Sequence, residues 1–277
     1  MPTIRDALPD NRLPRLETRM LLAHALGHAR PANAHAWLVA RDTETLPADA
    51  TMHFNALIER RIAGEPIAYL IGHREFYGRD FACSPAALIP RPETELLIDL
   101  ALAELPADFS GHILDVGTGT GCIAITLALE RPQAHVTALD VSPDALALAR
   151  ANAAALGAGN VRCVESNWFA ELDASAQFDL IVSNPPYIVP GDAHLTQGDL
   201  RFEPTVALAD AVDGLESYRQ LAIGAHRHLA PGGWLMVEHG YDQGESVPSL
   251  LRTAAFADVA LHCDLAKLPR VTTARYP

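Results

Sequence analysis

Between Gly111 and Glu238, short apolar segments alternate with amphipathic segments, and this alternation limits the possible folds more than any other feature of the sequence. The apolar segments read HILDV, HVTALD, VRCV, FDLIVS and GWLMVE, and each has the length of a strand. Helical patterns separate them, the last near LESYRQLAIGAHRHL. Strands and helices in alternation form a mostly parallel sheet with helices on both faces. The sequence therefore predicts an α/β fold for this region.

About the first seventy residues show helical periodicity instead. The apolar face expected within RLETRMLLAHALG consists of Leu16, Met20 and Ala23, with Leu22 and Leu26 beside it. The face expected within TMHFNALIERRIAG consists of Phe54, Leu57, Ile58 and Ile62. Gly27 and Gly64 stand where a glycine commonly ends a helix. The sequence therefore predicts a small α-helical domain ahead of the α/β domain.

The length of the chain and the segment between these two patterns set the expected domain boundaries. A chain of 277 residues exceeds the usual size of one core, so we expect two domains. From residue 66 to 92 the sequence is rich in aromatic residues, glycine and proline, which suits a short hairpin or linker. We predict a helical domain over residues 1–73, a hairpin or linker over 74–90 and an α/β domain over 91–277.

The composition disfavours several classes of protein. With 49% apolar residues, 20% charged residues and no low-complexity tract, the chain is expected to be globular. No run approaches the roughly 18 apolar residues of a membrane helix, and the N-terminus lacks a signal-peptide core. We therefore expect a soluble cytoplasmic protein without membrane contact. A net charge of −13 repels phosphate backbones, which disfavours nucleic acid as a direct partner.

The potential metal ligands show no metal-binding spacing. The four cysteines are far apart and lie among apolar neighbours without a C-x-x-C pair, so we expect buried thiols at Cys83, Cys122, Cys163 and Cys263. The histidines, among them His24, His226 and His228, lack ligand spacing with acidic or cysteine partners. The sequence therefore predicts no zinc or redox motif.

A glycine-rich loop follows the first strand of the α/β region. In ILDVGTGTGCIAI, Gly117, Gly119 and Gly121 lie between a strand and a helix, where glycine permits a tight turn and close approach of a ligand. Asp140 ends the next strand, nineteen residues after Gly121, where a carboxylate can accept both hydroxyls of a ribose. Asp140 could instead be the N-cap of the helix that begins near Pro143. The combination predicts a nucleoside-containing ligand, and the G-x-G-x-G spacing weakens the case for a dinucleotide.

The segment SNPPY follows the strand FDLIV and is predicted to face the reaction centre, because ligands of α/β sheets lie beyond the carboxyl ends of the strands. The side-chain oxygen of Asn184 and the carbonyl of Pro185 are acceptors on a backbone stiffened by two prolines. Two fixed acceptors suit a planar NH₂ group, and Tyr187 is expected to form an aromatic wall beside it. The alternative is that NPPY is only a turn after a strand.

These motifs together resemble the seven-strand S-adenosylmethionine-dependent methyltransferases that act on an amino group conjugated to a planar system, either adenine or glutamine. Longer segments narrow the resemblance: RRIAGEPIAYLIGHREFYGRDFACSPAALIPRPETELL, RFEPTVALADAVDGL and GGWLMVEHGYDQGESV are similar to the peptide chain release factor N5-glutamine methyltransferases, the PrmC/HemK family. The similarity spans nearly the whole chain, including the helical first domain.

The resemblance implies a Rossmann-like seven-strand methyltransferase domain preceded by a small helical domain that recognises the substrate. It implies transfer of a methyl group from S-adenosyl-L-methionine to the glutamine of the Gly-Gly-Gln motif in class 1 release factors, with S-adenosyl-L-homocysteine as product and translation termination modulated. The implied cofactor site consists of Gly117, Thr118, Gly119, Thr120, Gly121, Asp140, Trp168 and Asn184. The implied substrate site consists of Asn184, Pro185, Pro186 and Tyr187, of which Asn184, Pro185 and Tyr187 are catalytic.

Residues around the implied cofactor site have alternative interpretations. Trp168 could be a core aromatic residue rather than a contact of adenine. Relatives often carry an acidic residue just before this tryptophan, whereas this chain has Asn167, whose oxygen can still accept from the adenine amino group. Relatives also tend to have glycines where this chain reads ALADAVDGL, and Glu203 either ties a loop near the site or is an exposed charge.

Two further groups of polar residues flank these motifs. In PRPETE, Arg91, Glu93 and Glu95 either frame the cofactor pocket or form a polar linker with a helix start. In LMVEHG, Glu238 and His239 resemble an acid–base pair, but methylation of an amide needs no base of that strength. We therefore expect Glu238 and His239 to have a structural role at the end of a strand.

Two other functions stay open at the level of the sequence. A nucleic-acid adenine N6-methyltransferase would share NPPY, although the net charge and the lack of a basic target-recognition domain disfavour it. A non-catalytic module that binds release factors or ribosomes is the second alternative. The preferred hypothesis is a monomeric protein-glutamine methyltransferase with class 1 release factors as partners and no direct contact with nucleic acid.

Overall fold

The computed structural model describes residues 2–8, 12–28, 34–210 and 212–277. The chain divides into two compact units, Met1–His73 and Arg74–Pro277, each with its own buried core. The described helices include none whose length and apolar character would let it cross a membrane.

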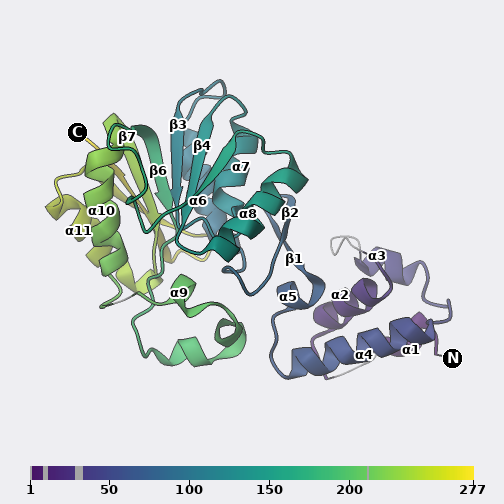
Figure 1. The fold of residues 1–277 in the computed structure, drawn as a ribbon. Coiled ribbons are helices and arrows are strands. Elements are labelled where there is room, and N and C mark those ends of the chain that lie inside the picture. Colours follow the sequence, from purple (N-terminus) through teal and green to yellow (C-terminus); the bar gives the residue numbers. More distant parts are fainter. Residues whose placement is uncertain (1, 9–11, 29–33, 211) are drawn as a thin grey trace. The chain divides into compact units, whose positions relative to one another are not determined.

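The first unit is helical, as predicted. Its helices, drawn in purple and blue in Figure 1, are α1 (Ile4–Ala7), α2 (Arg15–Ala25), α3 (Ala34–Val39), α4 (Ala48–Ile62) and α5 (Ile67–Ile71). Helix α2 packs against α3, α4 and α5, and buried aliphatic and aromatic side chains fill the space between them. Gly27 and Gly64 follow α2 and α4 with positive φ angles of 75° and 98°, as expected of glycines that end helices.

The predicted apolar face of α2 was partly wrong. Leu16 is 68% exposed, whereas Leu21 and Leu22 are fully buried. The buried stripe follows the positions that face the neighbouring helices, and Leu16, in the first turn of α2, lies outside it. In α4, Phe54, Leu57 and Ile58 are buried as expected, but Ile62 in the last turn is 47% exposed. Periodicity alone did not identify where each helix leaves the core.

The second unit contains the predicted α/β sheet. Its seven strands lie in the order β5-β4-β3-β6-β7-β9-β8. The strands are β3 (His112–Val116), β4 (His135–Asp140), β5 (Val161–Glu165), β6 (Phe178–Ser183), β7 (Leu229–Glu238), β8 (Ala257–Cys263) and β9 (Pro269–Arg275). Neighbouring strands pair in parallel across the first five of this order, β5, β4, β3, β6 and β7. Strand β9 pairs antiparallel with both β7 and β8. The α/β fold class is confirmed, and the antiparallel edge adds two strands that the apolar pattern did not predict.

Helices cover both faces of this sheet (Figure 1). They are α6 (Glu95–Glu104), α7 (Cys122–Glu130) and α8 (Pro143–Leu156) on one face, and α10 (Glu216–His228) and α11 (Ser246–Thr253) on the other. Adjacent strand residues serve opposite faces: Ile113 belongs to the core under α6 and α7, and Leu114 to the core under α10. Because these strands are buried on both faces, their segments are continuously apolar in the sequence.

A two-stranded hairpin precedes the sheet in the chain. It consists of β1 (His73–Phe76) and β2 (Arg79–Ala82), joined by Tyr77 and Gly78, which both have positive φ angles, 51° and 73°. Two positive φ angles define the two-residue turn that matches the twist of a hairpin. Asn152 of α8 ties this hairpin to the sheet domain, because its side chain donates to the Ala82 carbonyl at 3.1 Å and accepts from the Ala82 amide at 2.8 Å.

The expectation of four buried thiols was wrong at one end of the sheet. Cys83 and Cys122 are buried and Cys163 is half-buried, but Cys263 is exposed. Cys263 is the last residue of β8, which is one of the two edge strands of the sheet. An edge strand has no neighbouring strand on its outer side, so apolar neighbours in the sequence did not imply burial.

The order of the strands determines where a ligand can bind. From β3 the chain proceeds outward to β4 and β5, then returns to β6 on the other side of β3. The connections that follow β3 and β6 therefore diverge, which opens a crevice beyond the carboxyl ends of these two strands. The glycine-rich loop follows β3 and the NPPY segment follows β6, so the topology places both at this crevice.

Candidate active site

The glycine-rich loop connects β3 to α7 and lies against the end of β4. The backbone amides of Gly117 and Thr118 both donate to the Leu139 carbonyl, at 2.9 and 2.8 Å. Gly117, Gly119 and Gly121 have positive φ angles of 76°, 54° and 82°. Glycine adopts this region without the steric penalty that other residues incur. The path of the loop is thus set by its glycines and by its bonds to β4.

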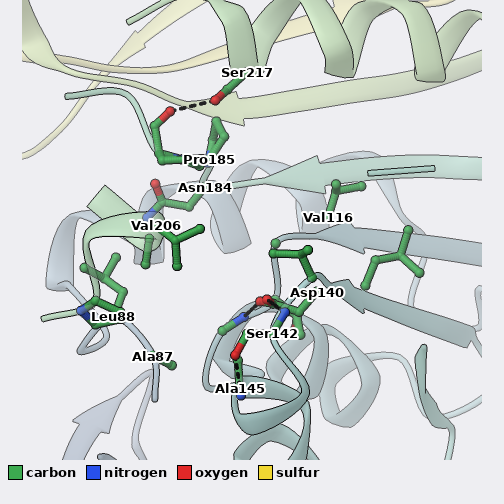
Figure 2. A pocket seen from close by; sticks show the side chains of 18 of the residues that line it. Ala87, Leu88, Val116, Asp140, Ser142, Ala145, Asn184, Pro185, Val206 and Ser217 are labelled. Carbon is green, nitrogen blue, oxygen red and sulfur yellow. Dashed lines mark hydrogen bonds between the residues drawn. The ribbon is translucent and has the colours of Figure 1, made fainter. Parts of the chain in front are cut away.

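Asp140 ends β4, and its carboxylate organises the loop. Oδ2 accepts from the Gly119 amide and Oδ1 from the Ser142 amide, each at 2.9 Å. A carboxylate has about four lone-pair sites, so Asp140 keeps acceptor capacity toward the cavity that it lines (Figure 2). The N-cap of α8 is Ser142, whose hydroxyl accepts from the Ala145 amide at 3.2 Å. The interpretation of Asp140 as the N-cap is therefore wrong.

The NPPY segment leaves β6 with two of its backbone carbonyls bonded to the protein. The Ser217 hydroxyl donates to the Pro186 carbonyl at 2.8 Å (Figure 2), and the Gln243 side chain donates to the Tyr187 carbonyl at 3.3 Å. Within the residues that the structure describes, no protein donor bonds to the Pro185 carbonyl or to the side-chain oxygen of Asn184. These two acceptors are the ones that the sequence predicted for a planar NH₂ group.

The other end of the Asn184 amide contacts the protein. Its nitrogen, Nδ2, donates to the hydroxyl oxygen of Thr94 at 3.3 Å. Thr94 is 2% exposed and ends the short 3-10 helix η2 (Pro92–Thr94). The oxygen Oδ1 is therefore the end of the amide that stays available to a ligand.

One cavity of about 610 Å³ connects these features (Figure 2). This volume lies within the usual range for small-molecule and cofactor sites. The predicted site residues in its lining are Gly117, Thr118, Gly119, Thr120, Asp140, Trp168, Asn184, Pro185 and Pro186. The structure thus brings the glycine loop, the acidic residue of β4 and the start of NPPY to a single cavity.

The charged residues of the lining favour a positively charged ligand. The lining contains the carboxylates Asp140, Asp210 and Glu216 and one guanidinium, that of Arg91. The Arg91 guanidinium forms an ion pair with Glu203, whose side chain is fully buried. A cavity with an excess of carboxylates concentrates cations.

Comparisons with known proteins identify the family. The family model described as PrmC N-terminal domain matches residues 3–72, and the Methyltransferase small domain matches residues 94–239. The release factor glutamine methyltransferase of Bordetella pertussis is 49% identical over 98% of this chain and 98% of its own length. The chain belongs to the release factor glutamine methyltransferase family. The family member of Neisseria gonorrhoeae is 48% identical over 96% of this chain and 95% of its own length.

A solved structure of a methyltransferase is similar to this chain in fold. The 16S rRNA N2 G1207 methyltransferase RsmC of T. thermophilus, in complex with AdoMet and guanosine, has a TM-score of 0.55 and 20% sequence identity. The match covers 74% of this chain and 50% of that chain. At this level of identity the likeness concerns the fold, and the methyltransferase fold agrees with the family assignment.

Two predicted site residues of this family member lie outside the cavity lining. Gly121 is the N-cap of α7, and a Cβ at this position would lie 2.7 Å from Ile125 Cδ1 and 3.2 Å from Ala149 Cβ. The geometry therefore indicates that Gly121 allows α7 and α8 to approach closely. The ring of Tyr187 packs against the core under α10, and burial raises the pKa of its hydroxyl to about 12. A direct ligand contact stays a prediction for both residues.

Ser166, Asn167 and Trp168 follow the end of β5 and line the cavity. Trp168 is half-buried, contacts the core under α10 and also lines the cavity, so its two interpretations are compatible. Its φ of 54° is unusual for a residue other than glycine, and such conformations often occur at functional sites. The Ser166 hydroxyl donates to the Trp168 carbonyl at 2.8 Å, and Asn167 is exposed at the cavity wall.

The PRPETE segment divides between the cavity and the hairpin. Glu203 accepts from the Ile89 amide at 3.0 Å and pairs with Arg91, so it ties the loop before α6 to the loop after η4 (Gly198–Phe202). Glu95 accepts from the Tyr77 amide at 2.8 Å and thereby anchors the hairpin. Glu93 is exposed at the start of η2. Of the three polar residues, only Arg91 lines the cavity.

Glu238 is the last residue of β7 and His239 follows it, and neither lines the cavity. Nδ1 of His239 lies 2.9 Å from the Gly240 carbonyl, which can only accept, so Nδ1 carries the proton. Nε2 then accepts from the Thr272 hydroxyl at 2.9 Å, and burial lowers the pKa of His239. Burial raises the pKa of Glu238 to about 7. These internal contacts support the structural role expected for His239.

Three functional positions in the second unit were missed in the sequence. Thr94 contacts Asn184, and Asn152 of α8 donates to the carbonyl of Thr120 in the glycine loop at 2.9 Å. Asp115 of β3 is completely buried, accepts from the Thr118 hydroxyl at 2.6 Å, and has a pKa that burial raises to about 7. Thr94 also lines the cavity, whereas Asn152 and Asp115 support the loop from outside the lining, and the partners of the three residues lie far along the chain or in the loop itself. A single sequence offers no signal for such contacts.

Proposed function

We propose that this protein transfers a methyl group from S-adenosyl-L-methionine to the side-chain nitrogen of the glutamine in the Gly-Gly-Gln motif of class 1 peptide chain release factors. Relatives with nearly half of their residues identical over almost the full chain bear the name of this activity. The observation that carries the proposal is a pair of acceptors, Asn184 Oδ1 and the Pro185 carbonyl, which bond to no donor among the described residues and lie in the cavity that also contains the glycine loop.

The cavity fits S-adenosyl-L-methionine. Asp140 retains lone pairs for the ribose hydroxyls, and Trp168 offers an aromatic surface for adenine. Gly117 and Gly119 have no side chain, so a ligand can approach the backbone of the loop closely at these two positions. When bound, the cofactor supplies an electrophilic methyl group on a positively charged sulfur. The excess of carboxylates in the lining suits that charge.

The substrate side must overcome the low nucleophilicity of an amide. The nitrogen lone pair of glutamine is delocalised into its carbonyl. Asn184 Oδ1 and the Pro185 carbonyl can accept one N–H each, which favours a pyramidal nitrogen and stabilises the positive charge that develops on it. The amide nitrogen gains a methyl group and loses a proton to water. A strong general base is not needed in this arrangement.

The helical unit supplies the second part of the proposal. We assign substrate recognition to residues 1–73, with the hairpin or linker of residues 74–90 leading into the catalytic domain of 91–277. The match of residues 3–72 to a domain named for this family supports that role. A monomer that acts in the cytoplasm, where release factors act, completes the proposal. The net charge of −13 supports the expectation that it binds no nucleic acid directly.

The test is a comparison of three potential methyl acceptors. The wild-type protein is incubated with methyl-labelled S-adenosyl-L-methionine and with unmethylated release factor, release factor whose motif glutamine is replaced by alanine, or adenine-containing DNA or RNA. We expect label only in the unmodified release factor. Label in nucleic acid alone would favour an adenine methyltransferase, and cofactor binding without any transfer would favour a non-catalytic binding module.

Asn184→Ala provides the matched variant. It removes one of the two acceptors, and the loss of a comparable transition-state hydrogen bond lowers kcat by about 10²- to 10³-fold. We expect the affinity for S-adenosyl-L-methionine to change far less, because Asn184 acts on the substrate nitrogen. Full turnover in this variant would contradict the proposed role.

A further inference from the structure

Three side chains from separate parts of the second unit meet behind the NPPY segment. Asn184 follows the end of β6, Glu238 ends the neighbouring strand β7, and Thr94 ends η2. The pairing of Ser183 with Val237 sets the register that places Asn184 and Glu238 at the same edge of the sheet. Thr94 and Glu238 are each 2% exposed. Thr94 and Glu238 are therefore almost inaccessible to bulk water, while Asn184 is half-buried at the cavity.

The hydrogen bonds of this cluster have a direction. Asn184 Nδ2 donates to Thr94 Oγ1 at 3.3 Å. Burial raises the pKa of the nearby Glu238 carboxylate, and the donor groups of the Thr94 and Asn184 side chains lower it. Thr94 has one hydroxyl proton. When this proton forms a hydrogen bond to the carboxylate, the hydroxyl oxygen can only accept a hydrogen bond from Asn184. Both neighbours of the amide nitrogen are thus acceptors.

The reversed orientation of the Asn184 amide would be unfavourable. Rotation by 180° would turn Oδ1 toward Thr94 Oγ1 and toward the ionised carboxylate of Glu238, which has no proton to donate. Two acceptors that face each other away from water repel, and the amide protons would lose their partners. The NH₂ group would then point toward the cavity, where it could not accept from a substrate N–H.

We propose that Thr94 and Glu238 are positioning residues that fix the orientation of the Asn184 amide, so that its oxygen faces the substrate nitrogen. This inference rests on the proposed function, because it concerns the acceptor that holds the glutamine amide. Glu238 does not line the cavity and so acts through Asn184. Glu238 Oε2 has no hydrogen-bond partner among the described residues, a costly arrangement for a buried group with no other role.

The test uses Thr94→Val, which keeps the shape of the side chain and removes the hydroxyl, with Thr94→Ser as the matched control that keeps it. Assays at pH 8 keep most of Glu238 ionised, because burial raises its pKa to about 7. We expect Thr94→Val to lower kcat by about 10- to 100-fold, the usual effect of removing a group that orients a reacting residue. Thr94→Ser should retain most of the wild-type kcat.

Glu238→Gln tests the other member of the cluster. Its amide can present an NH₂ group to Asn184 or Thr94, which permits the reversed orientation without a change in side-chain size. We expect kcat to fall about tenfold with cofactor affinity unchanged. Thermal unfolding of each variant separates this effect from a general loss of the fold.

A double-mutant cycle separates positioning from a purely structural role. If Thr94 acts through Asn184, Thr94→Val should cause no further loss of kcat in the Asn184→Ala background, measured by mass spectrometry in single-turnover reactions over hours. A loss of equal size in both backgrounds, an unchanged kcat in either single variant, or a Thr94→Ser variant as slow as Thr94→Val would overturn the inference. A wild-type protein that leaves release factor unmethylated would overturn the proposed function itself, and the inference with it.

Discussion

Gly121→Ala should destabilise the second unit far more than Gly157→Ala. The two glycines have nearly the same backbone conformation, with φ angles of 82° and 78°. Gly121 begins α7, and Gly157 ends α8. They differ in their surroundings, because a Cβ on Gly157 meets nothing within 4 Å. The pair therefore isolates steric packing from backbone strain.

The expected magnitude follows from these surroundings. An alanine in the left-handed region costs about 1–2 kcal/mol at either position. At position 121 the new Cβ would lie 2.7 Å from Ile125 Cδ1 and 3.4 Å from the Ala149 Cα, and Ile125 is fully buried. Overpacking of this kind adds about 1–3 kcal/mol. We expect the free energy of unfolding to fall by about 2–5 kcal/mol for Gly121→Ala and about 1–2 kcal/mol for Gly157→Ala.

Denaturant unfolding followed by circular dichroism measures this difference, and calorimetric binding of S-adenosyl-L-methionine at low temperature measures the affinity of the folded variant. We expect Gly121→Ala to bind the cofactor with a Kd within roughly threefold of the wild type, a change below 1 kcal/mol. Equal stability of the two variants would refute the packing argument. Normal stability with a large loss of affinity would show that Gly121 contacts the cofactor directly.

Three further predictions follow from the site. Asp140→Ala should weaken cofactor binding by about 10-fold or more with a smaller effect on kcat, as measured by calorimetry and turnover, because its contact exists before the reaction; unchanged affinity would contradict the ribose contact. Burial raises the pKa of Asp115 to about 7, so its contribution to stability is lost as the pH rises toward and through 7. Between pH 5 and 8 the free energy of unfolding of Asp115→Asn should therefore rise by roughly 2–3 kcal/mol relative to that of the wild type. Both proteins contain Glu238, so its own titration cancels from this difference. A difference that does not change with pH would refute the prediction. Thiol labelling of the native protein should modify Cys263 first and leave Cys83 and Cys122 unmodified, since burial raises the pKa of both buried thiols to about 12; rapid labelling of either would contradict the structure.

The sequence was most informative where local chemistry alone determines structure. Buried parallel strands are apolar throughout, so β3, β4 and β6 could be predicted from their composition. Glycines with positive φ mark the loop between β3 and α7, and the prolines of NPPY end β6. These signals depend on a residue and its near neighbours in the chain, and most of the residues that they marked line one cavity.

The sequence was least informative where a contact depends on residues far apart in the chain. Thr94 and Asn184 are separated by 90 positions, and nothing in PRPETE distinguishes a buried threonine from an exposed one. Strand β8 is mostly exposed at an edge of the sheet, and β9, although buried from residue 271 to 274, contains two threonines there, so neither strand has the apolar run of the central strands. The exposure of Leu16 likewise depends on which helices pack against α2, and a single helical pattern cannot show that.

Mass spectrometry of the methylated substrate tests the central claim most directly. Purified unmethylated release factor is incubated with the wild-type protein and S-adenosyl-L-methionine, and the peptides are fragmented to locate any added methyl group. The account predicts a single methyl group on the side-chain nitrogen of the glutamine in the Gly-Gly-Gln motif, with Asn184→Ala slowing its appearance by about 10²- to 10³-fold. A methyl group on any other residue, or none while the cofactor is bound, would contradict it.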